Sequence, residues 1–425
     1  MFYRQVSPGG ALSADDVARH TREALAGLPC DGKRVLCIIP DHTRSMPMPE
    51  VFQAVKEAVA PRAAALNFLI ALGTHPPMSA EMISRHLGAS PATGGYEIGG
   101  DGPGIRVYNH AWNDPAELAS LGWLDSDAVR SLTGDRMHEA VEVKINRRVL
   151  EHDVLLVTGP VFPHEVVGFS GGNKYFFPGV SGPEILNLFH WLGALITNRS
   201  IIGTKHTPVR EVINAAAAMI PRERYALCLT VMAKETRAVF FGRPEEAWEA
   251  AANLSARTHI VYKPRPFHSV LAMAPPMYED IWVAGKCMYK LEPVLADGGE
   301  LIIYAPHVRE VSVSHGDLIR RIGYHVRDYF VKQPGRFDDV PGGILAHSTH
   351  VRGGGTYEDG IERPRVQVTL ATGIPEEECR AINLGYRDPA SIQPEAWRDR
   401  EDEGLLLVER AGEVLYRLES ERVDV

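Results

Sequence analysis

Short apolar runs alternate with amphipathic segments over the N-terminal part of the chain. Residues 34–40 and 66–72 are apolar runs of strand length, and each is followed by a polar tip and then by apolar residues at helical spacing. The helices expected around them are residues 14–26 with Ser13 as N-cap, residues 49–60, and a helix that opens near Ser79. Two strand–tip–helix units in tandem predict an α/β fold with a doubly wound sheet, in which ligands bind at the carboxyl ends of the strands.

A third apolar run, residues 153–158, repeats this arrangement later in the chain. Each of the three runs leads into a tip that carries a histidine: His42, His75 and His164. A single histidine after a strand is usually a surface residue, but loops after strands also carry functional residues. Because three separate runs end in this way, we expect their tips to converge on one functional site.

The segment that follows the third run has several features of a ligand-binding loop. A glycine-rich turn at residues 168–172 precedes Lys174, and a helix opens near Pro183, with His190 at its far end. Glycines allow backbone N–H groups to approach an anionic group closely, and a lysine there can supply a charge or a covalent tether. The alternative is a buried turn with structural histidines. The combination favours the functional interpretation.

The remaining segments indicate a second domain, as expected for 425 residues. Region 91–125 is rich in glycine and asparagine and is expected to be irregular. Residues 263–267 break any regular element, which places the domain boundary near residue 264 and gives domains 1–264 and 265–425. The expected elements are helices at 209–219 and 243–257 and strands at 226–232, 269–274 and 300–305.

The composition, with 45% hydrophobic and 23% charged residues, is typical of a soluble globular protein. The formal net charge of −9 argues against a nucleic-acid partner, which usually requires a basic face. We find no signal-peptide-like or membrane-spanning apolar segment, so we expect a cytoplasmic protein with no membrane partner. Five cysteines without zinc-like spacing agree with reduced thiols in that compartment.

The first polar tip, from Asp41 to Arg44, has the sequence Asp–His–Thr–Arg. It can be a local turn closed by an Asx hydrogen bond. It can also be an anion clamp, because the planar guanidinium of Arg44 matches a carboxylate or a phosphate with two hydrogen bonds. The residues alone leave both interpretations open.

Residues 159–190 resemble the nickel-dependent lactate racemase family, whose members share the pattern PHxxxGFSGGxK…PG…H in this order. That family binds a nickel-pincer nucleotide, a pyridinium mononucleotide whose two thio-acid arms hold the metal. The resemblance implies that His164 is a catalytic acid/base, that Lys174 is covalently joined to one arm, and that His190 is the protein ligand to nickel. Imidazole suits both nickel binding and proton transfer near neutral pH.

The first tip and the glycine-rich turn carry further roles by the same resemblance. The family has the Asp–His–Thr–Arg motif at this position, which implies that Asp41 contacts the cofactor and Arg44 the substrate. Thr43 would donate to the nucleotide phosphate. The glycines of the turn, Gly171 and Gly172, would also bind the cofactor.

Two residues outside these segments complete the expected site. His75, in a motif similar to the family's GxHxP, would be the second catalytic acid/base, so that one histidine works on each face of a ketone-like intermediate. Lys286, at an expected helix start, resembles the family's lysine for the substrate carboxylate. It would close an active site in the interdomain cleft. The glutamine of the lactate enzymes is replaced here by Val283.

The second domain also carries polar side chains that the lactate enzymes do not show at matching positions: His307, His315, His325, His347, His350 and Arg352. Each of them alone is best explained as a solvated loop residue. As a group they predict a pocket with more hydrogen-bonding partners, because each hydroxyl buried without a partner costs about 1–3 kcal/mol. A polyhydroxy (sugar) acid would need such a pocket.

The resemblance implies a racemase or epimerase that inverts the α-carbon of a 2-hydroxy acid by reversible hydride transfer to the nickel-pincer nucleotide. Such an enzyme needs maturation proteins for its cofactor, without which it is an apo form. The absence of GxGxxG after the first strand agrees with a function that does not use NAD. The alternatives are a hydroxy-acid oxidoreductase with net oxidation, a zinc hydrolase, which lacks an HExxH motif here, and a non-catalytic cofactor carrier.

Overall fold

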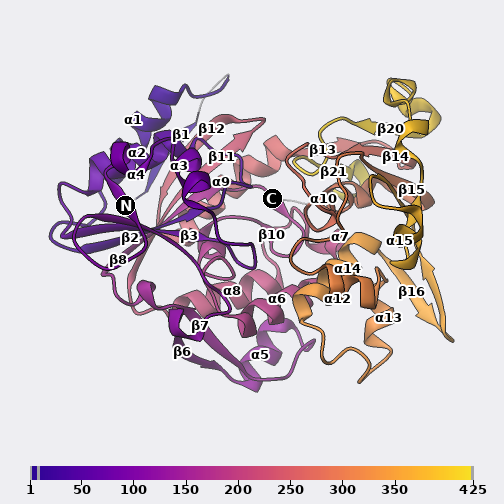
Figure 1. Cartoon of the computed structure of the whole chain (residues 1–425), viewed down its shortest axis with the longest axis horizontal. Coiled ribbons are helices and arrows are strands. Elements are labelled where there is room, and N and C mark those ends of the chain that lie inside the picture. Colours follow the sequence, from indigo (N-terminus) through magenta and orange to yellow (C-terminus); the bar gives the residue numbers. More distant parts are fainter. Residues whose placement is uncertain (1, 7–9, 423–425) are drawn as a thin grey trace. The chain divides into compact units, whose positions relative to one another are not determined.

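The computed structural model describes residues 2–6 and 10–422. The chain forms two compact units, each of which contains both strands and helices (Figure 1). The first unit comprises Met1–Phe162, Phe169–Leu186 and Pro208–Thr258. The second comprises Pro163–Gly168, Asn187–Thr207 and His259–Val425. The predicted α/β class is confirmed.

The first unit is built on an eight-stranded sheet in which the six strands from β11 to β4 are parallel. At its other edge β12 is antiparallel to both β11 and β1. In spatial order the strands are β1 (Tyr3–Val6), β12 (Glu235–Gly242), β11 (Glu223–Met232), β8 (Val154–Pro160), β2 (Arg34–Pro40), β3 (Ala65–Ala71), β5 (Ile105–Asn109) and β4 (Tyr96–Ile98).

Helices cover both faces of this sheet because its central strands are apolar on both sides. The helices α1 (Ala14–Leu25), α2 (Met48–Val59) and α3 (Ala80–Leu87) share one core with alternate residues of β2 and β3. Ser13 caps α1 as predicted, and Ser79, near which a helix was expected to open, caps α3; each accepts a backbone N–H of the first turn. In Figure 1, α1 and α2 lie on one side of the sheet and α8 (Pro208–Ala218) on the other.

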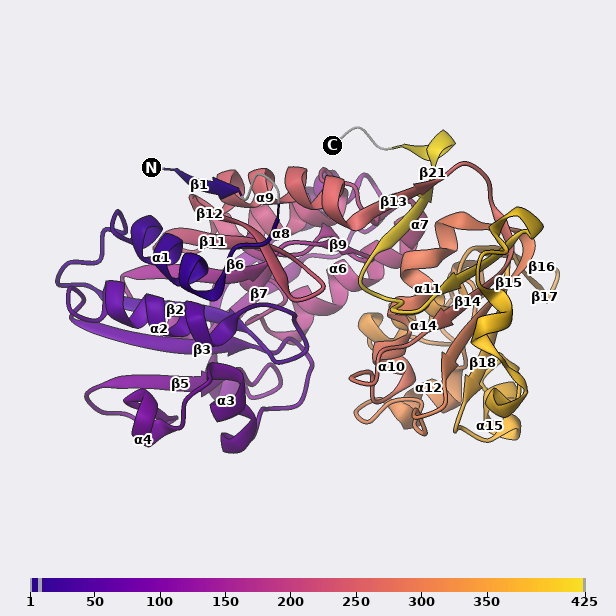
Figure 2. The ribbon, with the colours of Figure 1, turned by 90° about the horizontal axis from the view of Figure 1, so that it is seen from above.

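The carboxyl ends of β2, β3 and β8 lie at the same edge of the sheet. Pro40 pairs with Ala71, and Ile38 pairs with Val157, in parallel register. The polar tips that follow β2 and β3 therefore emerge side by side (Figure 2). The expectation that region 91–125 is irregular is wrong, because two short strands, β4 and β5, extend the sheet there. The glycines between them interrupt the alternation by which a strand is recognised.

The rest of the first unit consists of short elements around this sheet. They are α4 (Pro91–Gly94), β6 (Leu118–Leu124), α5 (Ser126–Thr133), β7 (Val141–Asn146), the 3-10 helix η3 (Gly172–Tyr175) and α9 (Pro244–His259). The helix α6 (Pro183–Ile196) begins in the first unit and continues into the second.

The second unit is built on a parallel five-stranded sheet, β19 (Gly385–Tyr386), β18 (Gln367–Thr372), β15 (Leu295–Ala305), β14 (Phe267–Met273) and β20 (Leu405–Val408). Smaller pairs are β9 (Pro163–His164) with β10 (Gly168–Phe169), β13 (Ile260–Lys263) with β21 (Leu415–Leu418), and β16 (Gly355–Glu358) with β17 (Ile361–Pro364). Its other helices are α7 (Asn198–Ile201), α10 (Ile281–Ala284), α11 (Lys286–Leu291), α12 (Gly316–Ile322), α13 (Arg327–Val331), α14 (Gly342–Arg352) and α15 (Glu376–Ala381).

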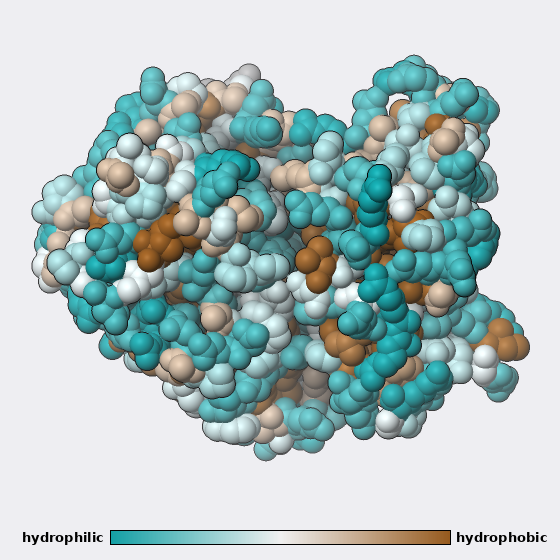
Figure 3. All heavy atoms as spheres, viewed as in Figure 1, coloured by the Kyte–Doolittle hydropathy of each residue, from teal (hydrophilic) through white to brown (hydrophobic). Residues whose placement is uncertain are grey.

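The surface seen in Figure 3 is mainly hydrophilic, with hydrophobic side chains in separate groups. Within residues 2–6 and 10–422, no helix combines the length and the apolar character that crossing a membrane requires. The five cysteines are free and buried.

Candidate active site

Asp41 and His75 form a close pair at the tips of β2 and β3. The Oδ2 atom of Asp41 lies 2.5 Å from Nδ1 of His75, and Asp41 is buried while the His75 side chain is 27% exposed. The parallel pairing of the two strands produces this contact, because it places both tips at the same sheet edge. The histidine of the first tip, His42, is exposed.

The electrostatics of this pair keep Asp41 ionised. Burial alone would raise the pKa of Asp41, but the charge and hydrogen bond of His75, the charge of Arg44 and the Thr43 hydroxyl together hold it well below its usual range. The Thr43 hydroxyl donates to Oδ1 at 2.6 Å, and the Thr43 amide donates to the same atom at 3.1 Å. Both carboxylate oxygens are therefore engaged by neighbouring residues. The Asx turn considered for this tip is present, together with the contact to His75.

The glycine-rich turn and Lys174 lie in the same unit, next to this pair. Lys174 is half-buried on η3, and the loop after η3 reaches the tip of β3, where the Gly73 amide donates to Gly179 O at 3.0 Å. Burial raises the pKa of the Tyr175 phenol well above its usual value, and the positive charge of Arg44 opposes this shift. The residue that follows Lys174 is thus within electrostatic range of the first tip.

Gly171 and Gly172 are required by backbone conformation and by packing. Their φ angles are +81° and +60°, in the left-handed region that favours glycine. A Cβ on Gly171 would lie 2.6 Å from Val161, and one on Gly172 would lie 2.8 Å from Cβ of Trp248. The turn is therefore held tightly against the interior of the first unit.

His164 belongs to the second unit, on the short hairpin of β9 and β10. The Val166 amide donates to its Nδ1 atom at 3.2 Å, and Glu165 Oε2 lies 3.4 Å from the same nitrogen. An amide N–H can only donate, so a neutral His164 carries its ring proton on Nε2. A neutral His75 carries its ring proton on Nδ1 instead, because the ionised Asp41 carboxylate can only accept a hydrogen bond from that nitrogen.

His190 lies on α6, which continues to Ile196, so this histidine is in the middle of the helix and not at its end. The half-buried ring stacks on Phe189, with 4.7 Å between ring centroids. One turn later, a Cβ on Gly193 would come within 3.0 Å of Val166. The part of α6 around His190 therefore packs closely on the hairpin that carries His164.

Lys286 is the first residue of α11, as predicted, and is half-buried. Its Nζ atom lies 5.1 Å from the ring centroid of Tyr278, within the range of a cation–π contact. Val283 is half-buried, and its amide is used by the Asp280 side chain that caps α10. One turn after Lys286, the Tyr289 hydroxyl contacts His347 Nδ1 at 2.8 Å.

Most of the polar array of the second unit is used internally. His347 is contacted by Tyr289 on one nitrogen and by Tyr324 on the other, at 2.8 and 3.3 Å. His325 contacts Glu362 at 2.9 Å. His350 differs, because its buried Nε2 atom has no hydrogen-bond partner among the residues that the structure describes.

His350 lies within electrostatic range of two residues beside the candidate site. Burial lowers the pKa of His350 to about 4, with smaller effects from the charges of Glu165 and His190. Neither Glu165 nor Tyr289 is among the site residues that the sequence predicts. Both could have been recognised by their positions in the sequence, since Glu165 follows His164 directly and Tyr289 lies one helical turn after Lys286.

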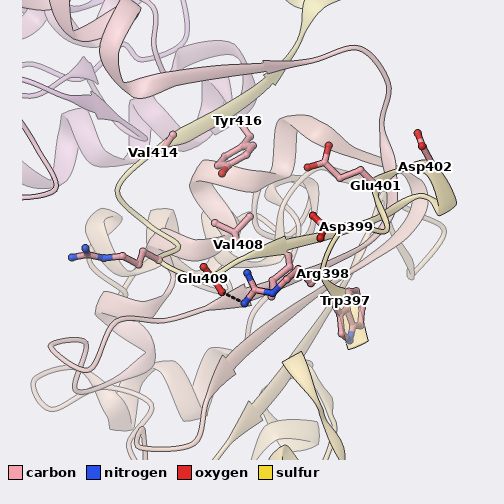
Figure 4. A pocket seen from close by; sticks show the side chains of 11 residues that line it. Trp397, Arg398, Asp399, Glu401, Asp402, Val408, Glu409, Val414 and Tyr416 are labelled. Carbon is pink, nitrogen blue, oxygen red and sulfur yellow. Dashed lines mark hydrogen bonds and ion pairs between the residues drawn. The ribbon is translucent and has the colours of Figure 1, made fainter. Parts of the chain in front are cut away.

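A separate pocket of about 640 Å³ lies in the second unit around β20 and β21 (Figure 4). Four of its charged residues, Arg398, Glu401, Asp402 and Glu409, form ion pairs. Arg398 contacts Glu409 at 2.6 Å, and Lys263 contacts Glu401 at 2.7 Å. No residue of the candidate site lines this pocket. Its polar, self-paired lining indicates a solvated surface hollow.

Among the described residues, no group of three or more His, Cys, Asp or Glu side chains is placed to hold a metal ion. The cofactor that the sequence resemblance implies would bring metal ligands of its own and would take one imidazole from the protein. A half-buried histidine on a helix, such as His190, can fill that role.

Comparisons with known proteins identify a family model and a curated relative. A family model described as the lactate racemase N-terminal domain matches residues 18–203. The lactate racemase of Thermoanaerobacterium thermosaccharolyticum is 23% identical over 321 residues, which cover 72% of this chain and 68% of that protein.

Two solved structures have a similar fold. A crystal structure of a Thermotoga maritima protein has a TM-score of 0.86 at 31% identity, over 97% of this chain and 99% of that chain. The lactate racemase apoprotein of T. thermosaccharolyticum has a TM-score of 0.72 at 17% identity, over 96% of this chain and 94% of that chain, a likeness of fold alone. From the matching domain we conclude that residues 18–203 belong to the family of lactate racemase N-terminal domains, and the curated relative extends the similarity over 72% of this chain.

Proposed function

We propose that this protein is a racemase or epimerase of 2-hydroxy acids in which His75 is a general base. The observation that carries the proposal is the 2.5 Å contact between Asp41 and His75. Because Asp41 is ionised and can only accept, it fixes the ring proton on Nδ1 and leaves a lone pair on Nε2. A histidine in this form can take the hydroxyl proton of a 2-hydroxy acid.

His164 is proposed as the second acid/base. In its neutral form the Nε2–H group can donate a hydrogen bond to the substrate oxygen, because the Val166 amide occupies Nδ1. The Glu165 carboxylate, 3.4 Å from Nδ1, would stabilise a positive charge on the ring. To return a proton to the oxygen when the α-carbon has been inverted, the His164 ring must also be protonated on Nδ1, and that proton must point to the Glu165 carboxylate in place of the Val166 amide.

The cofactor proposed is a nickel-pincer nucleotide, with Lys174 as its covalent attachment and His190 as the protein ligand to nickel. When bound, this group takes up a hydride from the α-carbon of the substrate and returns it. Gly171, Gly172 and Thr43 are proposed to contact the nucleotide. The tight turn that carries Lys174 and the accessible imidazole of His190 fit such a group. Loading would require the maturation proteins of the cofactor.

Arg44 and Lys286 are proposed to bind the substrate carboxylate, each with a half-buried cationic group. Arg44 can form two parallel hydrogen bonds with a carboxylate, whereas Lys286 acts as a point charge. The proposed substrate is larger or more hydroxylated than lactate. Val283 offers no side-chain hydrogen bond, and the buried Nε2 atom of His350 can accept or donate one to a substrate hydroxyl.

The decisive experiment uses protein matured together with the cofactor-synthesising proteins. Intact mass should show a nucleotide-sized adduct that peptide mapping assigns to Lys174. Incubation with single epimers of aldonic acids should interconvert the stereoisomers at C2 without accumulation of keto acid. Good turnover of lactate enantiomers with no turnover of aldonic acids would contradict the proposed larger substrate. Accumulated keto acid would instead identify the oxidoreductase alternative, and a matured protein with no adduct and no interconversion would refute the proposal.

A further inference from the structure

Arg210 is a buried cation beneath the glycine-rich turn of the first unit. It lies on α8, is 2% exposed and ranks among the largest fully buried side chains. Its Nη1 atom donates to Gly171 O at 3.3 Å, and its Nη2 atom donates to Phe169 O. Removing a guanidinium from water costs several kcal/mol unless its donors are satisfied, so these contacts are a requirement for burial. They also tie α8 to the turn.

Trp248 of α9 supports the same turn from beside Arg210. The guanidinium carbon lies 4.2 Å from the centroid of the indole, and Nε1 of the indole donates to Ser170 O at 2.9 Å. Three successive carbonyl groups, those of residues 169, 170 and 171, are thus held by one arginine and one tryptophan. A turn with this many fixed carbonyls has little freedom to change its direction.

The same contacts reach the turn that carries Lys174. Gly171 O accepts from the Arg210 guanidinium and also from the Lys174 amide, in both cases at 3.3 Å. The guanidinium therefore shares its acceptor with the hydrogen bond that opens η3. Any displacement of Gly171 O would alter the first turn of η3 and the direction in which the Lys174 side chain leaves it.

We propose that Arg210 is a positioning residue for Lys174, which fixes the turn in the conformation that cofactor attachment requires. This inference rests on the proposed role of Lys174 as the attachment site. Arg210 lies on α8, downstream of the glycine-rich turn, and orients Lys174 by holding that turn. Trp248 supports Arg210 through the stacking contact and through Ser170.

The experiment compares Arg210→Met with Arg210→Lys and with Arg417→Met as a matched control. Arg417 is a buried arginine of the second unit that donates to a backbone carbonyl, Ile202 O, at 2.8 Å. Arg417→Met also removes a buried guanidinium and its hydrogen bond, but at a place away from the turn. Any effect common to the two methionine variants is therefore general destabilisation.

The first measurement is amide hydrogen exchange of the apoprotein. Arg210→Met should speed exchange at residues 169–175 by about 10-fold or more relative to the wild type, since an anchored hydrogen-bonded turn is opened locally. Arg210→Lys should show a smaller change. Arg417→Met should leave these amides unchanged. Equal exchange at residues 169–175 in Arg210→Met and the wild type would overturn the proposal.

The second measurement is the fraction of matured protein that carries the Lys174 adduct. It should fall about 10-fold or more in Arg210→Met, since small misplacements of a reacting group have effects of that order, and it should recover in part in Arg210→Lys. An adduct fraction in Arg210→Met equal to that in Arg417→Met would also overturn the proposal.

Two outcomes require a further measurement: a wild type that carries no adduct, and an Arg210→Met variant that does not fold. If the wild type carries no adduct after maturation, the attachment role of Lys174 fails, whereas the exchange measurement still tests whether Arg210 holds the turn. If Arg210→Met does not fold, Trp248→Phe removes the donor to Ser170 O and part of the ring on which Arg210 stacks, and it should give a smaller acceleration at the same residues. No acceleration at residues 169–175 in Trp248→Phe would count against the proposal.

Discussion

Asp41 Oδ2 and His75 Nδ1 lie 2.5 Å apart although 34 residues separate them in the chain. The pair joins the tips of two parallel neighbouring strands, and the Thr43 hydroxyl fixes the other oxygen of Asp41. A buried carboxylate that orients an imidazole and stabilises its protonated form is a recurrent device in acid–base catalysis. It gives His75 a defined tautomer before any substrate binds.

Asp41→Asn should preserve the fold and remove this control of the tautomer. The amide has nearly the same shape, but its NH2 group can donate to Nδ1 and shift the ring proton to Nε2. We expect kcat of the matured enzyme to fall about 100- to 10,000-fold. Chiral analysis of product at saturating substrate, with adduct content measured on the same sample, checks this result.

Asp31→Asn is the matched control for that substitution. Asp31 is an exposed residue of the same unit that pairs with Arg62 at 2.8 Å. Exposed ion pairs contribute little, so its activity should equal that of the wild type. If Asp41→Asn were as active as Asp31→Asn, the contact with His75 would have no catalytic role.

Arg44→Lys should weaken substrate binding more than it slows the chemical step. Lysine keeps the charge but loses the planar pair of donors, and a hydrogen bond to a charged group contributes about 1.5–3 kcal/mol. We expect KM to rise about 10- to 100-fold with a smaller change in kcat. Initial rates over a range of hydroxy-acid concentrations separate the two parameters. A loss confined to kcat would argue against carboxylate binding by Arg44.

His110 should make the first unit less stable in acid. Burial lowers its pKa to about 4, although the Ser181 carbonyl and the charge of Glu117 favour the protonated ring. In the unfolded chain the pKa is about 6.5. Between these values the unfolded state binds more protons, so stability is complete above about pH 6.5 and is lost as the pH falls towards 4. The total loss is about 3 kcal/mol.

His110→Gln should lower stability at neutral pH, because the contact of Nε2 with Ser181 O is lost, but should flatten the dependence on pH. Urea unfolding of the apoprotein at several pH values between 4 and 7.5 measures this slope. His138→Gln, at a side chain that is 61% exposed, serves as the control and should keep the wild-type slope. An unchanged slope in His110→Gln would contradict the prediction.

Gly172→Ala should destabilise the protein more than Gly32→Ala. Both glycines have positive φ angles, +60° and +68°, so alanine is strained by about 1–2 kcal/mol at either position. Only at Gly172 does the new Cβ meet another group, 2.8 Å from Trp248 Cβ, whereas nothing lies within 4 Å at Gly32. Overpacking should add about 1–3 kcal/mol. Urea unfolding measures the difference, and equal losses would mean that the turn can move away from Trp248.

The sequence by itself determined the elements whose signals are local. The apolar run predicts β2 with its observed bounds, Ser13 is the N-cap that the sequence predicts, and a helix begins next to Ser79 as expected, because caps and periodicity depend on neighbours in the chain. Region 91–125 was misjudged, since β4 and β5 are short and owe their stability to their place in the sheet. The domain boundary at residue 264 stays a prediction.

Only the tertiary structure decided which side chains that lie far apart in the chain come into contact. The pairing of Asp41 with His75, the internal use of His347 and the anchoring of Gly171 by Arg210 depend on strand register and helix packing. A hydrogen bond is defined to within tenths of an ångström, whereas sequence spacing places a residue only at the end of an element. The sequence therefore predicted which residues are reactive, and the fold determined which neighbours contact His75 and His164.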